Sequence, residues 1–172
     1  MIRIAGVILV MVSSSFLGFA KGQQLQERLD ALKEIQKIFL SLLTDIQYGQ
    51  TLLPESLERI AGQSMQPFSD ILKKICVQMH RRGGKTLADI WKREMEQSLK
   101  NSALKPKERE ALIRMGYHLG NLDRKIQVQM IQLYLKDLEV GVAEVTDSIG
   151  GQQKLCRMLG VAGGLLIVLL LL

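Results

Sequence analysis

The 172-residue sequence has few of the residues from which catalytic and metal sites are built. Its two histidines, His80 and His118, are far apart and have no second ligand at the spacing of a metal site. Its two cysteines, Cys76 and Cys156, cannot form a disulfide framework. The residues GGKT that end at Thr86 lack the G-x-x-x-x-G-K-[ST] spacing of a phosphate-binding loop. We therefore expect no enzyme activity, no cofactor and no metal.

Aromatic residues are also scarce, at 5% of the chain, whereas positive charge is abundant but local. Residues 73–114 hold 12 Lys/Arg and 5 Asp/Glu, a net charge of +7, and residues 115–151 hold 3 and 5, a net charge of −2. Only Trp91 lies inside the basic stretch, so binding of nucleic acid through base stacking is not favoured. The stretch indicates an acidic partner or anionic lipid, unless it is only a solvated charged face. The candidate partner-binding residues are Arg81, Arg82, Lys85, Lys92 and Arg93.

Charge is absent from two apolar segments, residues 4–20 and 158–172, which bracket a polar middle. The first segment meets the lower limit of about 17 residues for a spanning helix. The second would reach roughly 22 Å of a hydrocarbon core ~30 Å thick, and could insert where the bilayer thins. We predict transmembrane helices at residues 1–20 and 158–172 and one domain at residues 21–157.

Basic residues flank both apolar segments on the side of the middle domain. Lys21 and Arg28 follow the first segment, and Lys154 and Arg157 precede the second. Because cytoplasmic flanks are enriched in Lys and Arg, the domain should be cytoplasmic and both termini outside. The alternative for the first segment is a cleaved signal peptide, because small residues also precede Lys21.

Glycines recur at a spacing of four in and beside the apolar segments. Gly18 and Gly22 form one G-x-x-x-G pattern, and Gly160 and Gly164 form another. Small residues at this spacing let membrane helices approach closely. We expect them to pack the two spans against each other or against another subunit.

The middle of the chain predicts helix throughout, with no strand of convincing length. Helices are expected at residues 21–48, 54–61, 67–82, 86–99, 106–119 and from residue 121 onward. The clearest pattern is a 3-4 spacing of apolar residues from Val128 to Ile149, which calls for a partner helix, and the apolar stripe of residues 25–46 is the natural one. The sequence therefore predicts an all-α fold, a six-helix bundle flanked by transmembrane helices.

Glycine also marks the expected turns. Gly120 precedes Asn121, where one helix should stop and the next begin, so it is expected in the left-handed conformation. Gly116, Gly120 and Asp123 are assigned to this structural turn. A valine at Gly120 should then cost about 1–3 kcal/mol, more than an alanine at Gly84 in a looser turn. Residues 150–151, both glycine, are expected to be a weak point before the second apolar segment.

Three blocks resemble the repeated domain of the type II secretion system F protein, the inner-membrane platform of secretion and pilus machines. They are GGKTLADI at residues 83–90, GYHLGNLD at 116–123 and the apolar segment at 159–172. In that family the second block usually reads Gly-Glu-x-(Ser/Thr)-Gly-x-Leu-Asp, which matches at Gly116, Gly120, Leu122 and Asp123. Tyr117 and Leu119 depart from it, and because Tyr117 replaces the acid, no metal site is carried over.

Over its whole length the chain resembles the stage III sporulation protein AB family more closely, in size, in the two anchors and in the LGNLD turn at residues 119–123. The resemblance implies a protein of the mother-cell membrane of an endospore former, in the channel that links mother cell and forespore. It implies a platform without enzyme activity that docks a secretion-type ATPase and other channel membrane subunits, and it allows a homo-oligomer. The alternative is a membrane-tethered basic adaptor for nucleic acid or anionic lipid, whose nucleic-acid binding would weaken steeply with salt.

Overall fold

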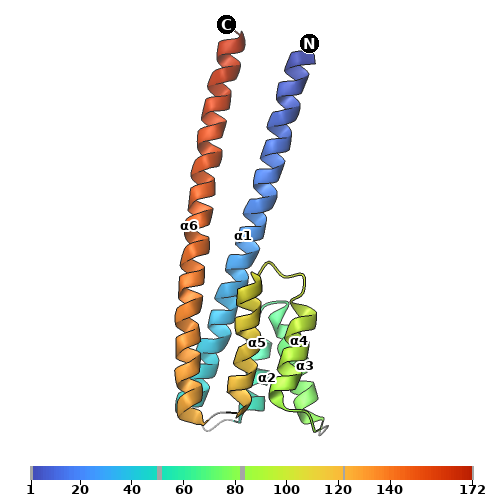
Figure 1. The fold of residues 1–172 in the computed structure, drawn as a ribbon, viewed down its shortest axis with the longest axis vertical. Coiled ribbons are helices and arrows are strands. Elements are labelled where there is room, and N and C mark those ends of the chain that lie inside the picture. The colour runs from blue at the N-terminus through green and yellow to red at the C-terminus, as the bar shows by residue number, and fades with distance from the viewer. Residues whose placement is uncertain (1, 50–51, 82–83, 122, 172) are drawn as a thin grey trace. The chain divides into compact units, whose positions relative to one another are not determined.

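The computed structural model describes the backbone of residues 2–49, 52–81, 84–121 and 123–171, and side chains within residues 22–49, 52–81, 84–120 and 123–151. Within these residues the chain is helical and contains no strand (Figure 1). The helices are α1 (Ile2–Tyr48), α2 (Leu53–Gln63), α3 (Phe68–His80), α4 (Leu87–Ser98), α5 (Pro106–Asn121) and α6 (Arg124–Leu171). The prediction of an all-α fold with six helices is confirmed.

Local signals account for most of the helix boundaries. Pro54 lies in the first turn of α2 and Pro106 begins α5, where a missing N–H costs nothing. A capping box begins α4: the Thr86 hydroxyl accepts a hydrogen bond from the Asp89 N–H at 3.2 Å, and the Asp89 carboxylate accepts one from the Thr86 N–H at 3.3 Å.

The two predicted membrane spans, residues 1–20 and 158–172, lie outside the residues whose side chains are described. A search of the described part of the chain finds no helix long and apolar enough to cross a membrane. The expected weak point at residues 150–151 is wrong, because α6 continues through both glycines without interruption. Where residues before and after a glycine are already helical, the helix continues through it with its backbone hydrogen bonds intact. Each glycine then lowers the stability of the helix by only about 1 kcal/mol.

The chain divides into two compact units, one of residues 1–29 and 143–172 and one of residues 30–142. In the first unit the buried Arg28 side chain lies 3.7 Å from the Glu144 carboxylate, next to the fully buried Val145. Gly22 is half-buried, whereas the side-chain surroundings of residues 18, 160 and 164 lie outside the described part. The predicted glycine packing and the domain boundaries therefore stay predictions.

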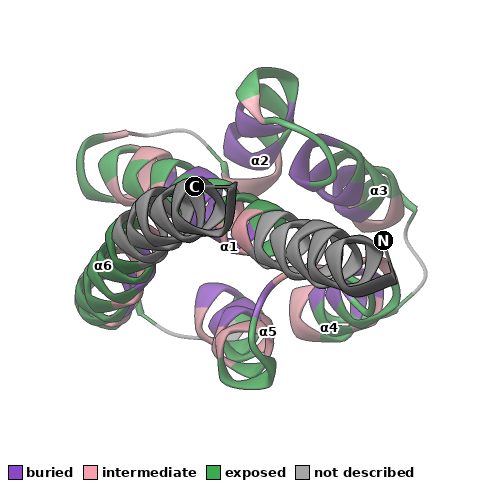
Figure 2. Ribbon diagram, turned by 90° about the horizontal axis from the view of Figure 1, so that it is seen from above, coloured by how far each residue is buried: buried purple, intermediate pink, exposed green. Residues whose placement is uncertain are grey.

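In the second unit the last part of α1 is the central helix. Phe39 is fully buried and makes edge-to-face contacts with Trp91 of α4, at 6.3 Å between ring centroids, and with Tyr134 of α6, at 4.9 Å. On α2, Arg59 forms an ion pair with Asp45 of α1 at 2.5 Å. Figure 2 shows the buried residues of the shorter helices facing inward. One helix thus contacts α2, α4 and α6.

Within this unit α1 and α6 are antiparallel neighbours, as the two apolar stripes predicted. At one end of the contact the Arg124 guanidinium donates hydrogen bonds to the carbonyl oxygens of Ile46 and Gly49, at 2.5 and 3.2 Å. Further along, a Cβ built at Gly141 of α6 would lie 3.6 Å from Leu32 Cδ1 of α1. Arg124 thereby satisfies carbonyl groups that the end of α1 leaves without helical partners.

The predicted left-handed turn at Gly120 is wrong. Gly120 is helical, in the last turn of α5, and among the described residues only Gly84 has a positive φ, at 70°. From the sequence we expected Gly120 to end α5, but a contact with the next helix satisfies the end of α5 instead. The Gln127 side chain, from the first turn of α6, donates a hydrogen bond to the Leu119 carbonyl oxygen at 2.7 Å.

Asp123 lies directly before α6, and its carbonyl oxygen accepts the first helical hydrogen bond, from the Gln127 N–H at 2.9 Å. It therefore has the position of a helix cap, which the prediction had given to Asn121. Asn121 instead belongs to α5. The boundary between the two helices therefore lies further along the chain than predicted, because α5 ends at Asn121 and α6 begins at Arg124.

Gly116 has a packing function that sequence reasoning missed. A Cβ at this position would lie 2.2, 2.3 and 2.7 Å from Cδ1, Cγ and Cβ of Trp91. The Trp91 indole N–H also donates a hydrogen bond to the buried Leu112 carbonyl oxygen at 3.0 Å. Helices α4 and α5 can therefore lie this close only because position 116 has no side chain.

Candidate partner-binding surface

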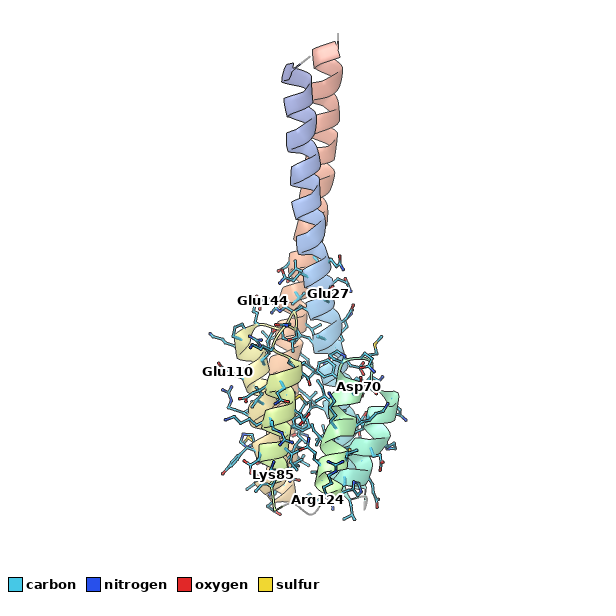
Figure 3. All side chains as sticks on the ribbon, turned by 90° about the vertical axis from the view of Figure 1, so that its right-hand side faces the viewer. Glu27, Asp70, Lys85, Glu110, Arg124 and Glu144 are labelled. Atoms are coloured by element: carbon cyan, nitrogen blue, oxygen red, sulfur yellow. The ribbon has the colours of Figure 1, made fainter. Side chains whose placement is uncertain are left out.

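The predicted basic site lies around the connection between α3 and α4, at the end of the second unit where Figure 3 shows Lys85 and Arg124. Arg81 follows α3 and is exposed, and its backbone N–H donates to the Val77 carbonyl oxygen at 3.3 Å. Lys85 is exposed directly before the capping box of α4. Arg82 lies outside the described residues. The left-handed Gly84 turns the chain between the two described cations.

The two predicted site residues on α4, Lys92 and Arg93, have charged partners, unlike Arg81 and Lys85. Lys92 lies 4.0 Å from Glu96, one turn along the helix, in an exposed ion pair. Arg93 donates to the carboxylate of Glu94 at 3.3 Å and to the side-chain oxygen of Gln78 on α3. Glu94 is nearly buried, with 8% of its side chain exposed. The charge of Arg93 is therefore partly compensated between α3 and α4, although 40% of its side chain is exposed, and its role in partner binding stays a prediction.

The structure adds cations on α3 that the candidate list omitted. Lys74, Val77 and Arg81 are exposed and follow one another at helical spacing, with Lys73 beside them. Val77 is 53% exposed although it is apolar. The signal was available in the sequence, because the exposed face of a helix has the same period as its buried face. We define the basic face as Lys73, Lys74, Arg81 and Lys85, with Val77 among them.

No residue of the basic face forms an ion pair with another residue of the described part. Unpaired cations on one face produce a positive potential that attracts an acidic surface and accelerates association. An exposed valine among them adds an apolar contact that a desolvated interface could bury. This arrangement can recognise an acidic partner.

The buried titratable groups do not assemble into a second site. Burial raises the pKa of the Cys76 thiol, with a further contribution from Glu58, and the sulfur lies 3.9 Å from the Pro54 carbonyl oxygen. Burial also raises the pKa of Tyr134, with contributions from Glu108 and Asp137. Among the described residues no group of three His, Cys, Asp or Glu side chains could hold a metal ion.

Comparison with known proteins gives one consistent result. The profile of the family described as stage III sporulation protein AB matches residues 3–172. The chain is 29% identical to stage III sporulation protein AB of Bacillus subtilis (strain 168) over 171 residues, which cover 99% of each chain. It is also similar to a solved structure of stage III sporulation protein AB, with a TM-score of 0.66 and 28% identity, over 72% of this chain and 97% of that one.

These proteins carry the name of a sporulation protein and none carries the name of an enzyme, in agreement with the prediction that the chain is not one. The match extends over the six-helix fold and over both apolar segments. The chain belongs to the stage III sporulation protein AB family.

Proposed function

We propose that this protein is a membrane platform subunit of the channel between mother cell and forespore, and that its helical domain docks a secretion-type ATPase. Family membership supports a role in sporulation. The observation that carries the platform role is the placement of the polar domain between two apolar segments with basic inner flanks. A domain anchored at both ends can act only at a membrane surface, where it can hold a cytoplasmic partner in place.

The anchors are tested by extraction and labelling of the full-length chain. Alkaline carbonate should leave the protein in the membrane pellet, because two apolar spans are not removed by breaking electrostatic contacts. A cysteine introduced at exposed Asn101 should not react with an impermeant maleimide until the cells are opened. Release by carbonate, or strong labelling of intact cells, would rule out the double anchor with a cytoplasmic domain. Recovery of a chain that begins at Lys21 would establish a cleaved signal peptide.

The basic face, Lys73, Lys74, Arg81 and Lys85, is the proposed contact with the ATPase. It offers unpaired charge and an exposed apolar residue along α3 and at the start of α4, whereas Arg93 is partly compensated by Glu94. Other channel membrane subunits would contact the membrane segments.

Charge reversal with a matched control tests this contact. Lys74→Glu with Arg81→Glu should weaken capture of the purified ATPase by the full-length chain by roughly tenfold or more at low salt. Lys107→Glu is the control, because Lys107 is an exposed lysine of α5 outside the basic face. Equal capture by parent and double variant would remove the basic face from the proposal. Equal loss in the Lys107 variant would show that only total charge matters.

A membrane-tethered adaptor for nucleic acid or anionic lipid is the second candidate, because the same unpaired cations would serve it. Nucleic-acid binding would lose affinity along a steep line of log K against log salt. Vesicles with anionic lipid would bind the chain more tightly than neutral ones. Protein docking through Val77 and complementary carboxylates would retain part of its affinity at high salt. The salt series therefore separates the two candidates.

A further inference from the structure

We propose that the outer face of α6 is a self-association surface on which a second copy of this chain packs with its α6 parallel. Ile126, Leu133 and Val140 are seven residues apart and therefore lie along one line of the helix. They are 40%, 56% and 71% exposed. The core residues of α6, such as Ile131 and Leu138, lie on the opposite face. We call the three exposed residues the outer stripe.

The outer stripe is unlike the rest of the exposed surface of α6. Figure 2 shows α6 exposed along its outer side. Single exposed apolar residues are ordinary on a protein surface, but three at a seven-residue spacing place one apolar residue on the same line of the helix in every second turn, which is half of the pattern that packed helices show. In this part of the structure α1 already covers the inner face of α6, through Phe39 and Leu32. Among the residues whose side chains are described, the outer stripe is therefore a second apolar face that no other helix covers.

The charges beside the outer stripe indicate which partner fits it. At 100° per residue, Lys136 lies on one flank of Leu133, and Asp137 lies on the other. Lys125 lies on the flank of Lys136, and Asp123 on that of Asp137. Lys136 and Asp137 cannot pair with each other, because adjacent helical residues do not face one another. Neither forms an ion pair with another residue of the described part.

Beside the outer stripe one flank carries Lys125 and Lys136 and the other Asp123 and Asp137, whereas Glu139 lies further round on the side of Lys136 and Asp147 follows the stripe on that side. Along the stripe itself such a surface is complementary to itself in one orientation. If two α6 helices pack in parallel around a two-fold axis, the basic flank of each meets the acidic flank of the other, so Lys136 faces Asp137 of the second copy. If they pack antiparallel, like flanks meet and Lys136 faces Lys136. The flanking charges therefore select the parallel pair. It is also the orientation of two chains anchored in one membrane, although the charges select it without a membrane.

Cross-linking of the full-length chain distinguishes the two orientations. In a Cys156→Ser background Val140→Cys should form disulfide-linked dimers rapidly, because parallel packing places position 140 of one copy beside position 140 of the other. Gln132→Cys is the matched control, because Gln132 is exposed on α6 but lies about a quarter turn from the outer stripe. Antiparallel packing would instead cross-link a mixture of Ile126→Cys and Val140→Cys chains. That result, equal cross-linking at Gln132, or none at Val140 would overturn the proposal.

Charge exchange gives a test that does not depend on cysteine chemistry. Lys136→Asp and Asp137→Lys should each weaken dimerisation by roughly tenfold, since each breaks two symmetric pairs. The double variant restores both pairs and should dimerise like the parent. The fluorescence of Trp91 verifies that each variant is folded. If the double variant is as weak as the single ones, or if the single variants dimerise normally, the outer stripe does not bind a second copy. Carbonate extraction remains a separate test of the membrane anchors.

Discussion

Replacing Gly116 with alanine should destabilise the protein although alanine is the better helix former. In an exposed helix interior this change stabilises by roughly 0.5–1 kcal/mol. Here the new Cβ would lie 2.2–2.7 Å from three atoms of Trp91. Real contacts of a Cβ atom are not found at such distances, so one of the two helices has to move.

Rotation of the indole cannot relieve the overlap. The third contact, at 2.7 Å, is with Trp91 Cβ, whose place is set by the backbone of α4. The ring is also fully buried, and its N–H bonds the Leu112 carbonyl oxygen at 3.0 Å. Overpacking costs about 1–3 kcal/mol, and a lost or strained hydrogen bond costs about 0.5–1.5 kcal/mol more. After the gain in helix propensity the net loss of stability should be about 1–3 kcal/mol.

Urea denaturation of the purified full-length chain measures this loss, with the fluorescence of its single tryptophan as the signal. The matched control is Gly120→Ala in the same helix, where a Cβ would meet Leu87 Cβ at an ordinary 3.4 Å. The control should change the free energy of unfolding by less than about 0.5 kcal/mol. If Gly116→Ala unfolds at the urea concentration of the parent, α4 and α5 are not held together by this close approach.

Three further changes have expected outcomes. Gly84→Ala should lower the free energy of unfolding by about 1–2 kcal/mol, because φ is +70° at this position. Gly84→Asn should lower it less, because asparagine tolerates the left-handed region better than alanine, and thermal unfolding of both variants measures the difference. Glu34→Ala should lower the free energy of unfolding by about 1–3 kcal/mol, because the buried Glu34 carboxylate accepts a hydrogen bond from the Met65 N–H at 2.8 Å. Glu34→Gln retains an acceptor and should lower it less. Equal melting temperatures of the two variants would contradict this reasoning. The folded state raises the pKa of Cys76 above its ordinary 9.0 and that of Tyr134 above its ordinary 10.0, so the unfolded chain releases these protons first. Stability to urea should therefore be unaffected by these groups at neutral pH and should fall as the pH rises above about 9, and Cys76→Ser should reduce the first part of that fall.

The helices could be predicted because their signals are local. Pro54, Thr86 with Asp89, and Pro106 each lie within one turn of the boundary that they determine. The pairing of α1 with α6 was predictable for a related reason: two long apolar stripes each needed a buried partner. Neither inference requires knowledge of where distant residues lie.

The errors arose where a distant residue decides the local structure. Gly120 needs no left-handed turn because Gln127, from the next helix, donates to the Leu119 carbonyl oxygen. Arg93 is 40% exposed, but its guanidinium donates hydrogen bonds to Gln78 and to the nearly buried Glu94, so its charge is partly compensated. A glycine signal or a charge count cannot anticipate either contact, because both depend on how helices pack. For the same reason Gly116 was assigned to a turn although its neighbour is Trp91.

At one end of the second unit the start of α6 is held by hydrogen bonds to distant residues, whereas the start of α4 is held by local ones. The first turn of α6 donates to Ile46 and Gly49 through Arg124 and to Leu119 through Gln127, so it ties down the ends of both α1 and α5. Beside the α3–α4 connection, Lys85 is followed by the Thr86–Asp89 capping box, whose hydrogen bonds span only three residues. The start of α6 is therefore fixed by the packing of the helices, and the start of α4 by its own sequence.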